Sequence, residues 1–324
     1  MSMKRVNPAT GETIETVDSH TDAAVDARLE AAHERYLEWR DVPMHERCEL
    51  LANAADVLRA NVEEYAGLMT REMGKPIAQA RSEVEKCAWV CEHYAEHAQH
   101  YLQDETLPSP PEAEAKVVHQ PLGVVLAVMP WNYPFWQVFR FAAPNLVAGN
   151  VGVLKHASNV PGCAEAIADV FDRAGFPEDC FQTLLVGGSR ANAVVEDERV
   201  RAVTLTGSEP AGRAVAETAG RELKKTVLEL GGADPFVVLD DADLDAAVET
   251  GVQARLLNSG QSCIAAKRFI IHDAVYDEFL DAFVDAMASQ TVGDPTDEAT
   301  DVGPQAREDL MRDLHDQVER SVQA

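Results

Sequence analysis

Apolar residues recur at helical spacing in three long segments of the first hundred positions, and this spacing predicts amphipathic helices. The run from Pro108 to Pro111 then breaks the pattern, and the short apolar run that follows is strand-like. The predicted helices cover residues 22–39, 45–72 and 76–103, and the strand-like run covers 115–119.

From residue 122 onward, short apolar runs alternate with amphipathic stretches. Apolar strands separated by helices are typical of a parallel sheet with helices on both faces. A second unit of the same kind begins at residue 236, and a length of 324 residues suits about two domains. We therefore predict an α/β fold. The first set has strands at 122–129, 151–154, 183–186, 202–205 and 226–230 and helices at 139–148, 163–174, 191–196 and 208–219; the second has strands at 236–239 and 269–271 and helices at 241–257, 275–288 and 306–322.

The net charge of the chain is −27, from 28 basic and 55 acidic residues. Such a surface repels phosphates, which argues against nucleic acid as a partner. The acidic residues are spread along the chain, as on an ordinary soluble surface. Adaptation to high salt is the alternative, because salt screens repulsion between like charges.

The chain has no apolar run of 18 residues and no apolar signal core at its start, so the sequence favours a cytoplasmic enzyme without membrane contact.

Six cysteines in so long a chain, without a C-x-x-C pair, do not predict a disulfide framework. Cys87 and Cys91 share a predicted helix with His93, His97 and His100, and histidines on one helical face could hold a metal. The two cysteines also belong to an apolar stripe at helical spacing, whereas the histidines lie beside acidic residues. We favour the stripe and predict no metal site.

One cysteine has a setting suited to covalent chemistry. Cys263 ends the segment Asn258-Ser-Gly-Gln-Ser-Cys263, and Glu229-Leu-Gly-Gly232 lies 34 residues upstream. A thiol and a carboxylate facing one pocket would provide a nucleophile and a base. The glycines would let a substrate approach the backbone closely.

Three further candidates each follow a predicted strand, at the edge where open α/β sheets bind ligands. Asn132 lies in a loop stiffened by two prolines and could donate to an oxyanion, although asparagine is also common in X-Pro turns. Lys155 could bind a ribose or phosphate, and the alternative is a surface lysine. Gly207 and Ser208 open a helix whose free amides could bind a pyrophosphate, although many strand-to-helix turns contain such a pair.

Taken together, these motifs resemble the aldehyde dehydrogenase superfamily. The matching segments stand in the family's order and spacing and span essentially the whole chain, from Asn7-Pro-Ala-Thr-Gly11 onward. The segments that match the superfamily are Met129-Pro-Trp-Asn132, Lys155-His-Ala-Ser158, Leu205-Thr-Gly-Ser208, Glu229-Leu-Gly-Gly232, Asn258-Ser-Gly-Gln-Ser-Cys263, Val292-Gly-Asp-Pro295 and Gly303-Pro304. Within the superfamily, the segments most similar to NAD(P)-dependent succinate-semialdehyde dehydrogenases are Trp136-Gln137 with Arg140, Lys155-His156 and Cys263-Ile-Ala-Ala-Lys-Arg268.

The resemblance implies a role for each catalytic residue. Cys263 would attack the aldehyde carbonyl, and Asn132 with the backbone amide of Cys263 would hold the oxyanion. Glu229 would activate the water that hydrolyses the thioester. A carboxylate at this position implies a free acid as product, because relatives that form acyl-CoA lack it.

The resemblance also implies a bound NAD or NADP. Many relatives that prefer NAD carry a glutamate where this chain has Ser158, and without that acid a 2′-phosphate beside Lys155 becomes acceptable. The cofactor residues carried over from the family are Trp131, Lys155, Ser158, Gly188, Gly207, Ser208, Ala211 and Leu230.

Arg140 would contact the carboxylate of the substrate, and the alternative is a structural ion pair. Some relatives carry a second arginine where this chain has Leu257. If Arg140 has no such role, the substrate would be another aliphatic or aromatic aldehyde. A function of a different class, a non-catalytic dinucleotide-binding fragment, also remains open.

The resemblance implies a domain division as well. Residues 1–107 and 120–231 would form a Rossmann-type dinucleotide-binding domain, 108–119 part of an oligomerisation hairpin, and 232–324 the first part of a catalytic domain. Family members form homo-oligomers and continue well beyond the length of this chain. We therefore expect an incomplete catalytic domain, impaired turnover and an open sheet edge at 115–119.

Overall fold

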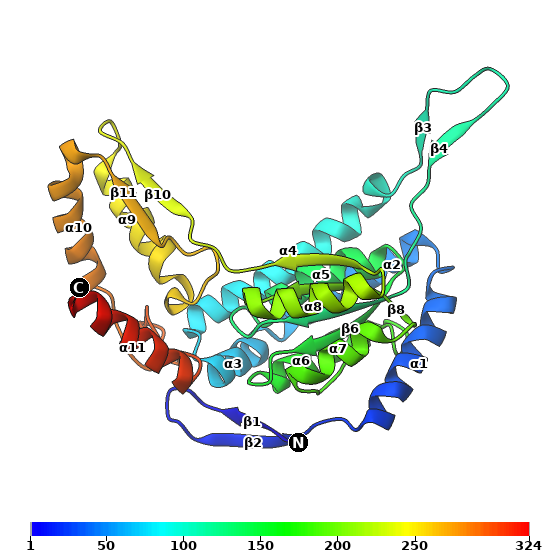
Figure 1. Cartoon of the computed structure of the whole chain (residues 1–324), viewed down its shortest axis with the longest axis horizontal. Coiled ribbons are helices and arrows are strands. Elements are labelled where there is room, and N and C mark those ends of the chain that lie inside the picture. The colour runs from blue at the N-terminus through cyan, green and yellow to red at the C-terminus, as the bar shows by residue number, and fades with distance from the viewer. Residues whose placement is uncertain (1, 324) are drawn as a thin grey trace.

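The computed structural model describes residues 2–323. Its centre is a five-stranded parallel sheet in the order β7-β6-β5-β8-β9 (Figure 1). The central strand β5 is the first strand of this sheet in the sequence. Strands β6 and β7 follow on one side of β5, and β8 and β9 then lie on its other side. The carboxyl ends of β5 and β8 therefore border a topological switch point, where open α/β sheets bind ligands. The strands are β5 (Val124–Met129), β6 (Val151–His156), β7 (Phe181–Thr183), β8 (Val200–Thr206) and β9 (Lys225–Glu229).

Helices cover both faces of this sheet. Right-handed crossovers place α5 and α6 on one face and α7 and α8 on the other. The helices between and before the strands share one apolar core. They are α1 (Asp22–Trp39), α2 (Met44–Ala60), α3 (Val62–Met73), α4 (Ile77–Tyr101), α5 (Trp136–Val147), α6 (Pro161–Arg173), α7 (Gly188–Glu196) and α8 (Glu209–Arg221).

The predicted helix 45–72 is wrong, because two helices meet at Asn61. This residue leaves helical geometry at φ −126° and ψ 25°. Its side-chain amide donates to the carbonyl of Val57 at 2.7 Å, and its side-chain oxygen accepts from Arg173 at 2.9 Å. Asparagine competes for backbone groups in this way at helix ends, so the local chemistry overrides the apolar periodicity.

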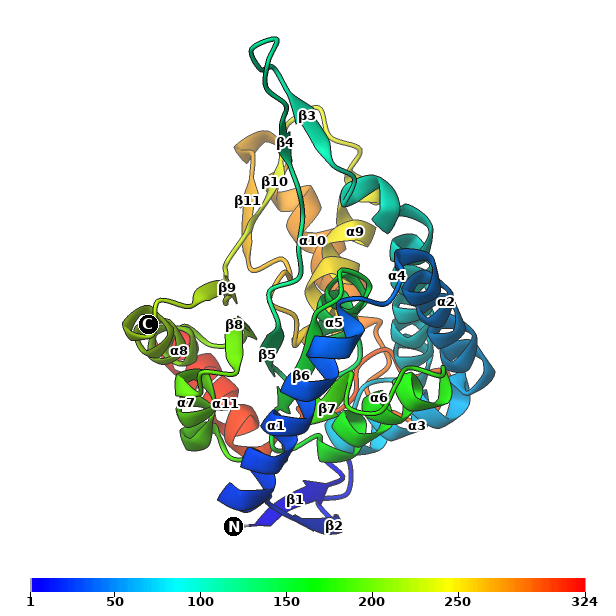
Figure 2. The same cartoon turned by 90° about the vertical axis from the view of Figure 1, so that its right-hand side faces the viewer.

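Two hairpins lie outside the main sheet. One joins β1 (Ser2–Val6) to β2 (Thr13–Asp18), and the sequence pattern did not predict it. The other joins β3 (Glu105–Leu107) to β4 (Ala115–Val117) and projects from the body in both views (Figures 1 and 2). The predicted strand at 115–119 thus has a partner in its own chain, and its second edge stays open.

A second, smaller unit follows β9. Strands β10 (Pro235–Val238) and β11 (Arg268–Ile271) pair in parallel and pack with α9 (Leu244–Leu256) and α10 (Tyr276–Ala288) around a separate apolar cluster. Helix α9 begins three residues later than predicted, because Asp243 caps it by accepting the amide of Ala246 at 3.1 Å. The last helix is α11 (Glu308–Gln323). Within residues 2–323, no helix is long and apolar enough to cross a membrane.

Candidate active site

The three predicted catalytic residues line one cavity at the carboxyl edge of the sheet. Its volume is about 490 Å³. Asn132 comes from the loop after β5, Glu229 ends β9, and Cys263 lies in the loop between α9 and β11. The tertiary structure thus brings together three residues that are up to 131 positions apart in the sequence.

Asn132 ties its own loop to the loop of Cys263. Its side-chain amide donates to the carbonyl of Gln261 at 3.0 Å, and its side-chain oxygen accepts the amide of Tyr133 at 3.1 Å. The side chain of Asn258 donates back to the carbonyl of Asn132 at 2.7 Å. An asparagine amide carries two hydrogens, so a second N–H remains for a ligand.

The loop that carries Cys263 has a strained backbone. Asn258, Ser259 and Gly260 have φ values of 57°, 55° and 75° in succession. A left-handed conformation at a non-glycine residue costs on the order of 1–3 kcal/mol and persists only where the surroundings hold it. Here Gln79 accepts the amide of Asn258 at 2.7 Å, and Ser259 accepts the amide of Gly303 at 2.9 Å. The loop is therefore held from two directions.

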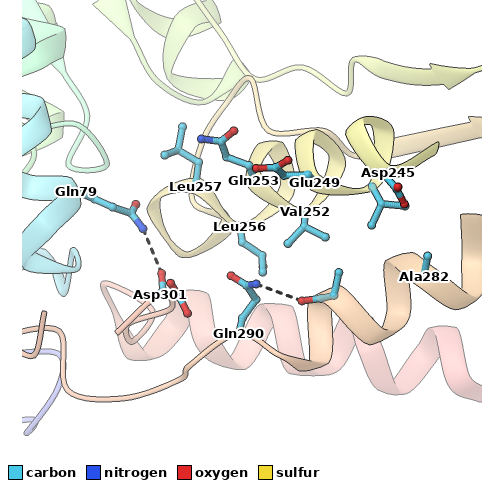
Figure 3. A pocket seen from close by; sticks show the side chains of 12 residues that line it. Gln79, Asp245, Glu249, Val252, Gln253, Leu256, Leu257, Ala282, Gln290 and Asp301 are labelled. Atoms are coloured by element: carbon cyan, nitrogen blue, oxygen red, sulfur yellow. Dashed lines mark hydrogen bonds between the residues drawn. The ribbon is translucent and has the colours of Figure 1, made fainter. Parts of the chain in front are cut away.

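Gln79 is a functional position that the sequence analysis missed. Its side chain also donates to the carbonyl of Asp301 at 3.1 Å, so it links α4 to two loops (Figure 3). The cavity drawn in Figure 3, of about 580 Å³ between α9 and α10, contains none of the predicted site residues. Its position shows that the size of a cavity does not identify the reactive centre.

Backbone carbonyls hold the segment after β9 and the loop of Cys263 in place. The carbonyl of Glu229 accepts the amide of Gly207 at 3.0 Å. The ammonium of Lys267 donates to the carbonyl of Cys263 at 2.7 Å and to that of Gly232 at 2.6 Å. Lys267, to which the sequence analysis assigned no role, therefore fixes the thiol loop to the segment after β9. The carboxylate of Glu229 itself is exposed.

A second cavity, of about 430 Å³, reaches Cys263 from the side of α4 and α5. Arg140 and Glu229 both line it. Arg140 forms no ion pair with any residue between 2 and 323, so the structural ion pair considered as its alternative role is absent there. Its guanidinium remains available to an anionic ligand.

A buried ion pair builds the wall of this second cavity. Lys75 and Glu83 are almost fully buried and bonded to each other, and the Lys75 ammonium lies 3.9 Å from the ring centre of Tyr133. The other oxygen of Glu83 accepts the amides of Phe135 and Trp136, each at 2.9 Å. The pair thus anchors the Asn132 loop and the start of α5. Its members are eight residues apart and Lys75 precedes α4, so helical spacing could not reveal their contact.

The predicted cofactor residues divide into two groups. Trp131, Gly207, Ser208 and Leu230 line the first cavity, where Ser208 precedes α8 and makes no side-chain capping bond. A Cβ on Gly212 would lie 2.6 Å from Leu230, so α8 packs closely on the segment after β9. The remaining predicted residues line neither of the two cavities; they are Lys155, Ser158, Gly188 and Ala211.

Lys155 nevertheless has an unusual environment. It lies near the carboxyl end of β6 and is 7% exposed. Among the described residues, its ammonium makes no hydrogen bond or ion pair. Burial lowers the pKa of Lys155. Ser158, three residues later, is exposed. A buried cation without a protein partner among residues 2–323, three positions before a hydroxyl, fits a phosphate or a ribose hydroxyl.

His156 holds the two edge loops together. Its Nδ1 accepts the amide of Ala157 at 2.9 Å and lies 3.3 Å from the carbonyl of Met129, and its Nε2 lies 3.0 Å from the carbonyl of Pro134. A proton on Nε2 fits the two shorter contacts. Burial lowers the pKa of His156 to about 4.

On α4, Cys87 and Cys91 are fully buried, as the apolar stripe predicted, while the rings of His93 and His97 stack with their centres 4.7 Å apart.

The sequence model of the aldehyde dehydrogenase family matches this chain over residues 1–324. Two curated relatives named NADP(+) succinate-semialdehyde dehydrogenase are those of Mycobacterium avium, 54% identical over 327 residues, and Mycobacterium tuberculosis, 52% identical over 331 residues. The matches cover all of this chain and 69% and 71% of those proteins. The solved succinic semialdehyde dehydrogenase of Streptococcus pyogenes in complex with NADP+ is 38% identical, with a TM-score of 0.95, over 98% of this chain and 70% of that one. The predicted α/β fold is therefore confirmed.

Proposed function

We propose that this chain, which belongs to the aldehyde dehydrogenase family, oxidises succinate semialdehyde to succinate with NADP+. The names of the relatives support this proposal. The observation that carries it is the position of Cys263 at the junction of two cavities. One cavity contains the glycine turn before α8, and the other contains Arg140, a cation without an acidic partner among residues 2–323.

The residues around Cys263 suit acyl transfer. The Cys263 thiolate attacks the aldehyde carbon, and the free N–H of Asn132 with the backbone amide of Cys263 stabilises the oxyanion. When bound, the nicotinamide ring supplies a hydride acceptor. Glu229 then takes a proton from water, which attacks the thioester on Cys263 and releases the acid. These roles explain why the Asn132 loop and the thiol loop are bonded to each other.

The cofactor site fits a dinucleotide with a 2′-phosphate. Lys155 is a buried cation without a protein partner in the described part of the chain, and the position three residues later carries a hydroxyl instead of a carboxylate. Gly207 and Ser208 would present the amides of α8 to the pyrophosphate, and Trp131 and Leu230 would line the same cavity. Gly188 and Ala211 would complete the site from α7 and α8. NAD remains the second candidate, because the ribose hydroxyls also suit Lys155.

The substrate assignment rests on Arg140, and a comparison of two aldehydes tests it. We expect kcat/KM for succinate semialdehyde to exceed that for uncharged butyraldehyde, and Arg140→Leu to remove about 10–100-fold of this preference, as for a lost charged hydrogen bond. Arg213→Leu, which removes an exposed arginine paired with Glu209 on α8, is the matched control. Equal rates with both aldehydes in the unmodified protein would exclude a carboxylate-bearing substrate.

A non-catalytic dinucleotide-binding role is the second candidate. A burst of NADPH that disappears in Cys263→Ala would exclude this role, whereas NADP+ binding without any burst would support it.

We also propose the predicted domain division and homo-oligomer formation in the cytoplasm. The projecting β3–β4 hairpin supports homo-oligomer formation, because it has exposed apolar residues beside an open strand edge; they are Leu107, Val117 and Val118. Light scattering on the protein with all three changed to serine tests whether this hairpin joins subunits.

A further inference from the structure

The cavity that contains Arg140 has a charge balance opposite to that of the chain. The whole chain has 28 basic and 55 acidic residues, whereas this cavity is lined by three basic and two acidic ones. The basic residues are Lys75, Lys86 and Arg140, and the acidic residues are Glu83 and Glu229. A small anion approaching the protein therefore meets a repulsive surface and an attractive cavity.

Only part of this positive charge is cancelled within the protein. Lys75 is buried and bonded to Glu83, so the two charges offset each other. Lys86 is exposed on α4 and forms no ion pair or hydrogen bond with any residue between 2 and 323. Its ammonium lies 4.0 Å from the ring centre of Trp136. An aromatic face attracts a cation at this distance, which holds the ammonium at the cavity without neutralising it.

Helix α5 relates the positions of Lys86 and Arg140, because Lys86 contacts its first residue and Arg140 lies one turn later. Trp136 is the first residue of this helix, and Arg140 follows four positions later, so the two side chains share one helical face. Lys86 is exposed, whereas Arg140 is half-buried. The cavity wall thus offers an exposed cation, Lys86 of α4, on the ring of Trp136, and a half-buried cation, Arg140, on the same helix as Trp136. Cys263 lines the same cavity.

We propose that Lys86 is a specificity-determining residue that attracts small carboxylates into the cavity of Cys263, ahead of their contact with Arg140. The inference rests on the proposed function, because it assumes a substrate that carries a carboxylate. Exposed charges act over about 10 Å at 0.1 M salt and less at higher salt, so the effect of Lys86 should decrease as salt is added.

Alkylation of Cys263 tests this role without cofactor or turnover. Iodoacetate and iodoacetamide both form a thioether with the thiolate and release iodide, but only iodoacetate is an anion. Mass spectrometry of the Cys263 peptide gives the rate with each reagent, and the ratio of the two rates cancels changes in thiol reactivity. Cys48, the other cysteine that is not fully buried, provides an internal reference away from the cavity.

We expect Lys86→Gln to lower the iodoacetate-to-iodoacetamide ratio at Cys263 by about threefold or more at low salt, and to change the ratio at Cys48 far less. Lys86→Arg should retain the ratio of the unmodified protein. The matched control is Lys116→Gln on the projecting hairpin, which removes one positive charge at a residue that does not line the cavity. The difference between Lys86→Gln and the unmodified protein should disappear in about 1 M salt.

A Lys86→Gln ratio equal to that of the unmodified protein, or to that of Lys116→Gln, would overturn the proposal. The aldehyde comparison separates this failure from a failure of the proposed function. If Lys86→Gln changes the alkylation ratio while succinate semialdehyde and butyraldehyde react equally, Lys86 attracts anions but the substrate assignment is wrong. If the ratio is unchanged and the substrate preference stands, Arg140 alone selects the carboxylate.

Discussion

The side-chain amide of Asn132 donates a 3.0 Å hydrogen bond to the carbonyl of Gln261, two residues before Cys263. This bond sets the amide beside the thiol loop before any substrate binds. A donor that is already oriented loses little free energy to reorganisation when an oxyanion forms. The bond therefore connects the position of one loop to the chemistry proposed for the other.

Replacing Asn132 by Ala should slow the NADPH burst by about 10²–10³-fold, the usual effect of removing one oxyanion donor. Asn132→Asp keeps the shape but replaces the N–H donor with an acceptor, so it should be at least as slow. Rapid mixing with succinate semialdehyde measures the burst. A loss below about tenfold in a variant with an unchanged melting temperature would show that Asn132 only shapes the loop.

Glu229→Gln should separate the two halves of the reaction. We expect one NADPH per active Cys263 in the first turnover, followed by a steady state that is about 10²–10⁴-fold slower, because water loses its base. Stopped-flow absorbance at the NADPH band distinguishes these phases. If the burst disappears as well, although iodoacetamide still modifies Cys263, the carboxylate would be acting before thioester hydrolysis.

Ser158→Glu should move the cofactor preference toward NAD. A carboxylate beside Lys155 would repel a 2′-phosphate and could instead accept hydrogen bonds from ribose hydroxyls. We expect the ratio of kcat/KM for NADP+ to that for NAD+ to fall at least about tenfold, or about 1.4 kcal/mol. Ser158→Gln, similar in size but uncharged, should change the ratio less; equal effects would point to side-chain volume rather than charge.

Glu83→Gln should destabilise the protein by about 3–5 kcal/mol, because it leaves the buried Lys75 ammonium without a counter-charge. A glutamine oxygen can still accept the amides of Phe135 and Trp136, so the change isolates the ion pair. Urea unfolding measures the difference. Glu85→Gln, on the same helix but in an exposed pair with Arg59, should cost under about 1 kcal/mol. Similar losses in both variants would contradict the account of the buried pair.

His156 should make the protein less stable as pH falls below neutrality. Burial lowers the pKa of His156 in the folded state to about 4, from 6.5 in a free chain. The unfolded chain therefore binds the proton first, and the free energy of unfolding decreases between pH 6.5 and 4. Between pH 7.5 and 5.5 this residue should account for roughly 1 kcal/mol. Urea unfolding of the unmodified protein and of His156→Gln measures the difference in slope, and identical slopes would refute the assignment.

Much of the fold could be predicted because apolar periodicity reports which side of an element is buried. The alternation after residue 122 predicted every strand of the main sheet, although the strand expected at 183–186 is observed at Phe181–Thr183. The pattern failed where a polar side chain set the boundary of a helix, as at Asn61 and Asp243. It also failed at the N-terminal hairpin, whose strand Thr13–Asp18 is mostly exposed and so carries little apolar signal.

The catalytic candidates and the family were evident from short motifs, because residue type and local spacing are properties of the sequence itself. Only the tertiary structure decided which of them share a cavity and that Glu83 neutralises the charge of Lys75. It also decided that Lys86 and Arg140 have no acidic partner within residues 2–323. These relationships join residues that are far apart in the chain or lie on different elements. Such contacts depend on which elements pack against each other, and the periodicity of one element shows its buried face but does not identify its neighbours.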